Sequence, residues 1–148
     1  MDGNLDGTNR WDIGAYETVD PGVDTDADGL PDCWEHQYWG NIRSGEASMD
    51  DDQDGIANRG EYIADLDPTN PLSRLELTGL EPLPLGMRVS WRGGQLARQY
   101  LDIRTNLGST SEQWAAIFTN LPPTAMVTNI IDAGATNATL FYRIRVER

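Results

Sequence analysis

The sequence predicts a mainly β chain in which a small α-helical module precedes a C-terminal antiparallel β-sandwich of about six strands. Two observations support this fold class. From residue 74 onward, apolar and polar residues alternate with a period of two, as in strands that have one buried face. Between residues 24 and 64, two similar blocks rich in aspartate and glycine each run into a short segment of helical character. We therefore expect three parts, residues 1–20, 21–72 and 73–148.

The first part is a polar segment rich in turn residues, with glycine at positions 3, 7 and 14. Its few apolar residues alternate with polar or small ones and indicate one strand or an edge fragment; they are Trp11, Ile13, Ala15 and Tyr16. A segment of this length is too short to fold alone. We therefore expect it to belong to a larger structural unit.

The second part contains an internal repeat. Residues 24–29 (DTDADG) recur with an offset of 26 as residues 50–55 (DDDQDG). The predicted helices follow at residues 31–39 and 57–64, the first ended by Gly40 and the second by Asp67-Pro68. Apolar side chains are expected to pack the two helices together; they are Trp34, Tyr38, Trp39, Tyr62, Ile63 and Leu66. Residues 69–73 have the composition of a linker.

The third part consists of short alternating segments separated by turn residues. The clearest strand candidates are residues 75–77, 87–91, 101–103 and 142–146, and weaker ones are residues 114–118 and 127–131. Clusters of turn residues lie between them, at residues 93–94, 106–111, 122–123 and 133–134. This pattern is typical of a small antiparallel β-sandwich.

The charge is unevenly distributed and excludes several function classes. The chain carries 24 acidic residues and 11 arginines, a net charge of −13, and residues 1–72 alone carry 18 acidic residues and three arginines. Without a basic stripe we expect no binding to nucleic acid or to an anionic membrane surface. No apolar run is long enough to span a membrane, and the first 20 residues lack the features of a signal peptide. If the protein is exported, we expect its signal upstream of this sequence. The single cysteine, Cys33, excludes an internal disulfide and a cysteine-cluster zinc site, and the single histidine, His36, argues against a histidine-based triad or a histidine-rich metal site.

Both repeats match the twelve-residue EF-hand calcium loop, which supplies oxygen ligands from positions 1, 3, 5, 7, 9 and 12 and has glycine at position 6. The predicted ligands of the first loop (residues 24–35) are Asp24, Asp26, Asp28, the Leu30 carbonyl, Asp32 and Glu35. Those of the second loop (residues 50–61) are Asp50, Asp52, Asp54, the Ile56 carbonyl, Asn58 and Glu61. The pattern predicts two Ca²⁺ sites. The alternatives are solvated Asx-rich turns and, less suited to the motif, magnesium.

The helix that precedes a true EF-hand loop is missing, because Pro21-Gly22 comes before the first loop and Gly45 and Ser48 come before the second. A loop followed only by an exit helix resembles dockerin modules and thrombospondin type 3 calcium repeats. Residues 61–71 (EYIADLDPTNP) are similar to stretches that follow such loops in secreted bacterial proteins. This resemblance implies Asp67 and Asp65 as further ligands, with helix termination as the alternative. Many dockerins have aspartate where Glu35 and Glu61 stand, and this difference argues against the dockerin interpretation.

The N-terminal flank, residues 2–17 (DGNLDGTNRWDIGAYE), resembles the closing segment of secreted bacterial right-handed β-helix proteins of the pectate-lyase-like kind. The resemblance implies an upstream β-helix domain of the same polypeptide as a partner. A third calcium loop would use Asp2, Asn4, Asp6 and Asp12, although Ile13 stands where an acidic ligand is needed. An Asx-rich turn is the alternative.

Residues 74–148 resemble a fibronectin type III-like module, on the strength of residues 89–91, 100–107, 114–122 and 141–146. The seventh strand of that family has no counterpart, so we expect an open sheet edge. Trp91, Trp114 and Tyr142 are candidates for a carbohydrate-stacking platform, but alternating aromatic residues are more often core.

These resemblances imply a calcium-binding, non-catalytic structural or spacer region at the C-terminus of a secreted or cell-surface bacterial protein. A cell-surface or matrix polysaccharide is a candidate partner. The alternative is a carbohydrate-binding or cohesin-type adhesion module attached to a polysaccharide-degrading enzyme. We do not expect enzymatic activity, because nearly all carboxylates lie in the metal loops and the sandwich half has no paired motif.

Overall fold

The structure is a computed structural model that describes residues 22–108, 110, 113–135 and 139–148. The predicted segment 1–20, with its candidate third calcium loop, lies outside the described residues. The chain divides into two compact units, which we call the loop unit (Met1–Tyr62 with Asp67–Asn70) and the sandwich unit (Ile63–Leu66 with Pro71–Arg148). Among the described residues, no helix combines the length and the apolar character needed to cross a membrane.

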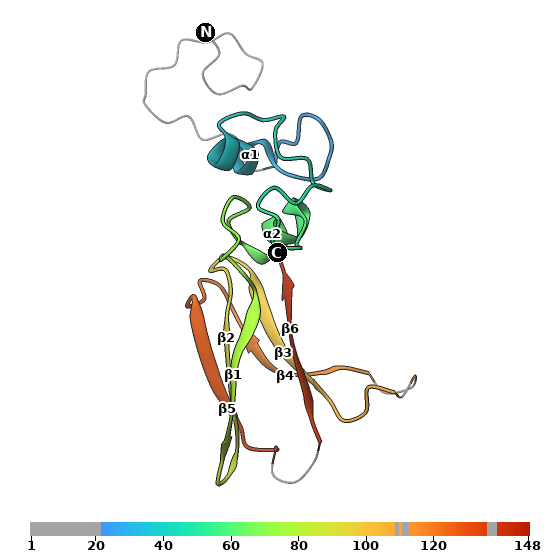
Figure 1. Cartoon of the computed structure of the whole chain (residues 1–148), viewed down its shortest axis with the longest axis vertical. Helices are drawn as coiled ribbons and strands as arrows, with labels where there is room; N and C mark the ends of the chain where they lie inside the picture. Colours follow the sequence, from blue (N-terminus) through green and yellow to red (C-terminus); the bar gives the residue numbers. More distant parts are fainter. Residues whose placement is uncertain (1–21, 109, 111–112, 136–138) are drawn as a thin grey trace. The chain divides into compact units, whose positions relative to one another are not determined.

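The two predicted helices are present at nearly the expected positions. Helix α1 spans Asp32–Trp39 and helix α2 spans Asn58–Ala64 (Figure 1). Helix α1 ends at Gly40, which has a φ of 70° and donates its N–H to the His36 carbonyl, because glycine adopts this left-handed conformation at little cost. The boundary between the two units falls within α2, after Tyr62.

Aromatic side chains form the packing of the loop unit. Trp34 of α1 is buried, and its ring makes edge contacts with Tyr38, Trp39 and Tyr62 at centroid distances of 5.0, 5.3 and 5.5 Å. Edge-to-face aromatic pairs are favourable beyond the area that they bury. The predicted aromatic packing of the two helices is therefore confirmed, whereas Ile63 and Leu66 belong to the sandwich unit.

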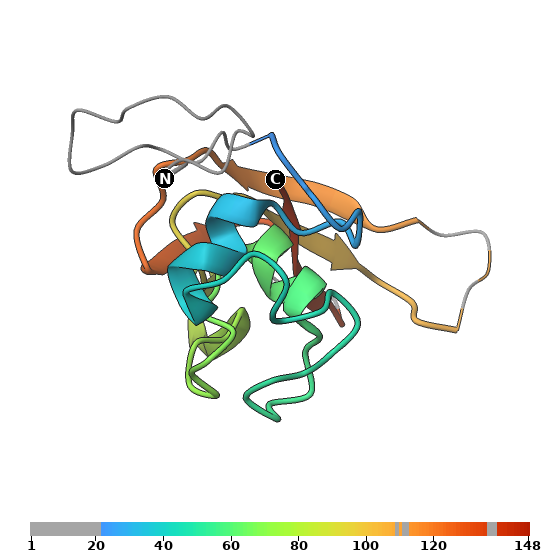
Figure 2. The same ribbon diagram turned by 90° about the horizontal axis from the view of Figure 1, so that it is seen from above.

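Among the residues that the structure describes, the sandwich unit contains six strands in two antiparallel sheets of three strands each (Figures 1 and 2). The strands are β1 (Glu76–Leu83), β2 (Gly86–Arg92), β3 (Arg98–Arg104), β4 (Ala115–Asn120), β5 (Val127–Asp132) and β6 (Phe141–Glu147). One sheet has the order β1-β2-β5 and the other the order β4-β3-β6. The prediction of a mainly β chain with a six-stranded, sandwich-like arrangement and two short helices is confirmed.

The core of the sandwich unit forms where the alternating residues of both sheets face inward. Val89, Trp91 and Leu101 are fully buried. Other side chains pack against them, namely Leu77, Met87, Phe118, Ile130, Tyr142 and Ile144. The indole N–H of Trp91 donates to the Gln99 Oε1 atom at 2.8 Å, so the one polar group of this ring is satisfied inside the core.

The first strand is longer than the sequence pattern predicts. Strand β1 continues past residue 77 to Leu83, where it pairs with Gly86 of β2. Its register shifts between Leu77 and Gly79, and most of its later side chains are exposed, so the alternation expected from burial is lost. The two weaker strand candidates, residues 114–118 and 127–131, correspond to β4 and β5, and each of these strands lies at one edge of its sheet. The described residues of the β3–β4 connection project away from both sheets (Figures 1 and 2).

Candidate metal centre

The two predicted loops have the same backbone conformation. The glycines at position 6, Gly29 and Gly55, have φ angles of 97° and 96°, and the residues at position 4, Ala27 and Gln53, have φ angles of 61° and 63°. Positive φ is uncommon for residues other than glycine. Its recurrence at equivalent positions shows that the sequence repeat is also a structural repeat.

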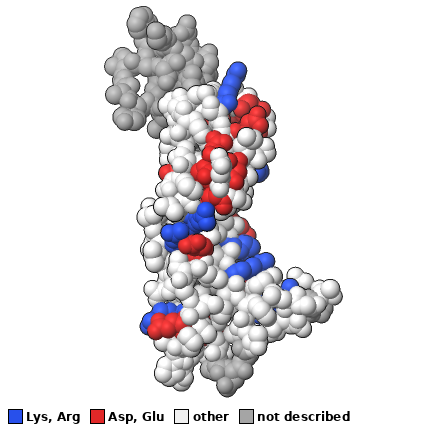
Figure 3. Space-filling view, viewed as in Figure 1, with Lys and Arg blue, Asp and Glu red and all other residues white. Residues whose placement is uncertain are grey.

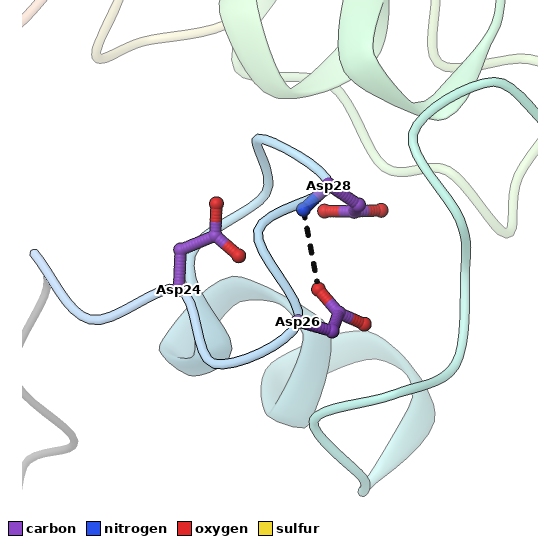
Figure 4. Close-up of side chains that lie close together, drawn as sticks. All are labelled: Asp24, Asp26 and Asp28. Atoms are coloured by element: carbon purple, nitrogen blue, oxygen red, sulfur yellow. Dashed lines mark hydrogen bonds between the residues drawn. The ribbon is translucent and has the colours of Figure 1, made fainter.

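Each loop brings three carboxylates together. One oxygen from each of Asp24, Asp26 and Asp28 lies within 4.8 Å of the others, and Asp50, Asp52 and Asp54 form an equivalent triad (Figure 4 shows the first). On the face drawn in Figure 3, acidic side chains gather over the loop unit, whereas arginines lie among the acidic residues of the sandwich unit. Grouped carboxylates repel one another unless a cation lies between them.

Hydrogen bonds within the loops orient these carboxylates. The carboxylate of Asp24 accepts the N–H groups of Ala27 and Gly29 at 2.8 and 3.0 Å. In the second loop, Asp50 accepts the Gly55 N–H at 2.9 Å and Asp54 accepts the Ile56 N–H at 2.8 Å. Glycine is required at position 6 because its positive φ directs the N–H toward the first aspartate.

The residues at position 9 close the loops. Both Asp32 oxygens accept hydrogen bonds from Thr25, one from its N–H at 2.7 Å and one from its hydroxyl at 2.6 Å. In the second loop, the Asn58 Oδ1 atom accepts the Asp51 N–H at 3.4 Å, and Nδ2 donates to the Glu46 carbonyl at 3.0 Å. Asp32 and Asn58, predicted as ligands, therefore also tie the start of each loop to its exit helix.

The glutamates at position 12 are the most informative groups of the site. Glu35 is 1% exposed and Glu61 is 0% exposed. Among the described residues, no hydrogen-bond partner is found for Glu35 Oε2 or for either carboxylate oxygen of Glu61. Buried charged oxygens without a partner are strongly unfavourable. These atoms are therefore suited to contact a cation.

The pKa values of the two glutamates are raised by their burial and by the nearby carboxylates. Burial, followed by repulsion from Asp26 and Asp28, raises the pKa of Glu35 to about 7. Burial and then repulsion from Asp52 and Asp54 raise the pKa of Glu61 to about 8. Asp67 adds to this repulsion. A cation bound among the carboxylates would remove the repulsive part of both shifts.

The donor set fits a hard divalent cation. Each loop offers only oxygen: three aspartates, a buried glutamate and a backbone carbonyl at position 7 (Leu30 or Ile56). Calcium prefers about six to eight such ligands in a flexible arrangement, whereas softer metals favour nitrogen and sulfur. The side chain of Leu30 is fully buried.

The two loops are connected directly. The Oδ2 atom of Asp28 accepts the Ala47 N–H at 2.7 Å, and the Ala47 carbonyl accepts the Arg59 N–H at 3.0 Å. The guanidinium of Arg59 donates to the Gly29 carbonyl at 3.4 Å. Neither Ala47 nor Arg59 is a ligand in the motif. The sequence pattern gave no signal for their role, because it arises from contacts between residues 19 and 30 positions apart.

The further ligand candidates lie in different surroundings. Asp67 belongs to the loop unit and accepts the N–H and hydroxyl of Thr69 at 3.0 and 2.7 Å. Asp65 belongs to the sandwich unit, where its Oδ2 atom accepts the N–H groups of Gln95 and Leu96 at 2.8 and 2.9 Å. The candidates of the third loop, Asp2, Asn4, Asp6 and Asp12, lie outside the described residues.

The aromatic residues considered for carbohydrate stacking do not form one surface. Trp91 is fully buried in the sandwich core, and Tyr142 packs against that core and donates its hydroxyl to Asp132 at 2.8 Å. The Trp114 ring is covered by the Arg143 guanidinium, which lies 4.4 Å from its centroid. Trp91 is therefore a core residue, as the alternative interpretation predicted.

Comparison of the chain with protein-family models, with curated proteins and with solved structures found no match.

Proposed function

We propose that the chain binds two calcium ions, one in the first loop and one in the second, and serves as a non-catalytic structural region. The observation that carries this proposal is the buried Glu61 carboxylate, which faces the triad of Asp50, Asp52 and Asp54 and whose two oxygens have no hydrogen-bond partner within the part of the chain that the structure describes. In the first loop, one oxygen of the buried Glu35, Oε2, likewise has no hydrogen-bond partner among the described residues. When bound, calcium neutralises these carboxylates and fixes the loop around them.

The nature of the loops supports calcium over magnesium. Both loops end in a glutamate able to offer two oxygens to one ion, and the remaining donors come from a flexible turn. Magnesium requires a near-ideal octahedron and retains several waters. A loop of five or six protein donors is therefore better suited to the larger ion.

A structural role is supported by what surrounds the loops. Residues 40–49, which precede the second loop, contain no helix, so the helix pair that opens in calcium sensors is absent from this described stretch. This favours a module like thrombospondin type 3 repeats or dockerins. We infer that it acts as a spacer in a secreted or cell-surface bacterial protein, following a β-helix domain of the same polypeptide.

The strand order supports a fibronectin type III-like identity for the sandwich unit. In immunoglobulin-type sandwiches the first, second and fifth strands share one sheet, and the third and sixth share the other. Strands β1, β2 and β5 form one sheet here, and β3 and β6 pair in the other.

Calorimetric titration of the full chain with calcium tests the proposal. We expect two bound ions for the natural sequence and for Glu46→Gln, a control at an exposed glutamate outside the ligand positions. Glu35→Gln and Glu61→Gln should each lose one high-affinity site, because the amide supplies one neutral oxygen in place of a carboxylate. Tight binding of magnesium in preference to calcium would overturn the choice of ion, and absence of binding would overturn the proposal.

A further inference from the structure

We infer that calcium bound in the second loop stabilises the β-sandwich, although the sandwich unit contains none of the twelve loop ligands. The link is helix α2, which belongs partly to each unit. Asn58 and Glu61 are loop residues of this helix, and Ile63 and Ala64 at its end belong to the sandwich unit. The inference rests on the proposed function, since it requires that the loop binds calcium.

The segment Ile63–Leu66 is built into the sandwich unit. Ala64 is 4% exposed and Leu66 is 3% exposed. Asp65 has a left-handed backbone with a φ of 56°, and its carboxylate accepts the N–H groups of Gln95 and Leu96. The other Asp65 oxygen lies 3.6 Å from a guanidinium nitrogen of Arg148. Burial and these contacts together hold a backbone conformation that is costly for aspartate alone.

A close backbone contact joins this segment to the connection between β2 and β3. A Cβ atom at Gly94 would lie 2.3 Å from the Ala64 carbonyl oxygen and 2.1 Å from the Asp65 carbonyl oxygen. Only glycine allows this approach. The Gly94 carbonyl in turn accepts the Gln99 Nε2–H at 2.8 Å, and Gln99 accepts the indole N–H of Trp91. Contacts therefore run from the end of α2 to the buried centre of the sandwich.

Helix α2 has only seven residues, and helices of this length are marginal without other support. Glu61 lies in its middle, fully buried among carboxylates. When calcium is bound, Glu61 joins the middle of α2 to the same ion as Asp50, Asp52 and Asp54. Opening of the turn that leads into Ile63 and Ala64 then requires loss of the ion, so calcium opposes this opening. Ligand binding to a folded state stabilises that state by mass action.

Hydrogen exchange of the full chain, followed by mass spectrometry, tests the inference on the amides of β2 and β3. These strands hold Val89, Trp91 and Leu101, so their slow exchange reports opening of the sandwich core. At free calcium about ten times the Kd of the second loop, exchange should slow by up to about tenfold relative to a chelator solution. Calcium binding is measured by calorimetry on the same samples.

Two matched variants assign the effect to the second loop. Glu61→Gln should abolish most of the calcium-dependent slowing in β2 and β3, whereas Glu35→Gln, measured at calcium that saturates its remaining site, should retain it. Asp65→Ala should keep two bound ions and show a smaller calcium effect, because it removes the contacts to Gln95 and Leu96.

The outcomes separate this inference from the proposed function. Two bound calcium ions with unchanged exchange in β2 and β3 would overturn the inference alone. An equal loss of slowing in Glu61→Gln and Glu35→Gln would overturn the assignment to α2. Absence of calcium binding in calorimetry would overturn both the inference and the proposed function.

Discussion

Asp28 and Ala47 are joined by a hydrogen bond of 2.7 Å from the Ala47 N–H to the Asp28 carboxylate. Asp28 is the position-5 ligand candidate of the first loop, and Ala47 lies shortly before the second. The carbonyl of Ala47 accepts the N–H of Arg59, which lies in the exit helix of the second loop. The two loops are therefore parts of one hydrogen-bonded assembly within the loop unit.

Replacement of Arg59 by alanine should weaken the connection between the two loops. The guanidinium that donates to the Gly29 carbonyl is lost, and so is one positive charge near the carboxylates. Because hydrogen bonds join the two loops, we expect calcium to bind the natural chain cooperatively, with a Hill coefficient above one. In the variant this coefficient should fall toward one, while the affinity for the first ion stays equal or rises. Terbium luminescence or calorimetry measures both quantities. Arg43→Ala, at an exposed position, is the control, and an equal change in that variant would contradict the assigned role.

Replacement of Gly55 by alanine should weaken calcium binding in the second loop. Its φ of 96° is unfavourable for any residue with a Cβ atom, although no neighbouring atom lies within 4 Å of the added methyl group. The strain costs about 1–2 kcal/mol, which corresponds to an affinity loss of about 5- to 30-fold. Gly29→Ala should lose a similar amount, because its φ of 97° is strained in the same way and the group that its Cβ atom would meet at 1.8 Å is the flexible end of the Arg59 side chain. Calorimetry on single-site backgrounds measures each loss, and unchanged affinity in both variants would contradict the loop geometry.

The stability of the metal-free chain should fall as the pH rises. The unfolded glutamates lose their protons near pH 4.5, whereas Glu35 and Glu61 in the fold keep theirs to about pH 7 and about pH 8. Between these values the folded state binds more protons than the unfolded state, so its relative free energy becomes less favourable with each pH step. In chelator, the melting temperature should therefore be higher at pH 5 than at pH 8.

Saturating calcium should reverse this trend, because the bound ion requires ionised carboxylates. Calcium binding near pH 7 should then release protons, which is measured as a dependence of the calorimetric enthalpy on the ionisation enthalpy of the buffer. A melting temperature in chelator that increases from pH 5 to pH 8 would contradict the assignment of the raised pKa values.

The two tryptophans of the sandwich unit should differ sharply when replaced by alanine. Trp91 is fully buried and bonded to Gln99, so Trp91→Ala should cost about 3–5 kcal/mol of the free energy of unfolding. Trp114 contacts the Arg143 guanidinium at the surface, a contact worth about 0.5–1 kcal/mol. Denaturant unfolding followed by circular dichroism measures both. Equal losses in the two variants would contradict the placement of Trp91 in the core.

Much of the loop unit could be predicted from the sequence, because ligand chemistry fixes residue types at fixed spacing. The aspartates, the glycine at position 6 and the exit helices follow from that spacing and from stop residues such as Gly40. The deep burial of Glu35 and Glu61 could not be predicted, because it depends on how each loop folds back over its helix.

Contacts between residues far apart in the sequence could not be predicted either, because they also depend on the tertiary fold. The resemblance implies Asp65 as a further ligand, and the structure shows its carboxylate accepting the N–H groups of residues 30 and 31 positions later. The extension of β1 to Leu83 was also missed, because its exposed end shows no alternation and is held by pairing with β2. Pairing of this kind depends on the partner strand rather than on local pattern.

Equilibrium dialysis of the full chain against calcium, followed by elemental analysis, tests the central claim most directly. Two carboxylate triads and two buried glutamates predict two calcium ions bound by the two loops of each chain. In Glu61→Gln this number should fall to one. A third ion would come from residues outside those described and would persist in Glu35→Gln/Glu61→Gln. A chain that binds no calcium at millimolar free ion would contradict the account.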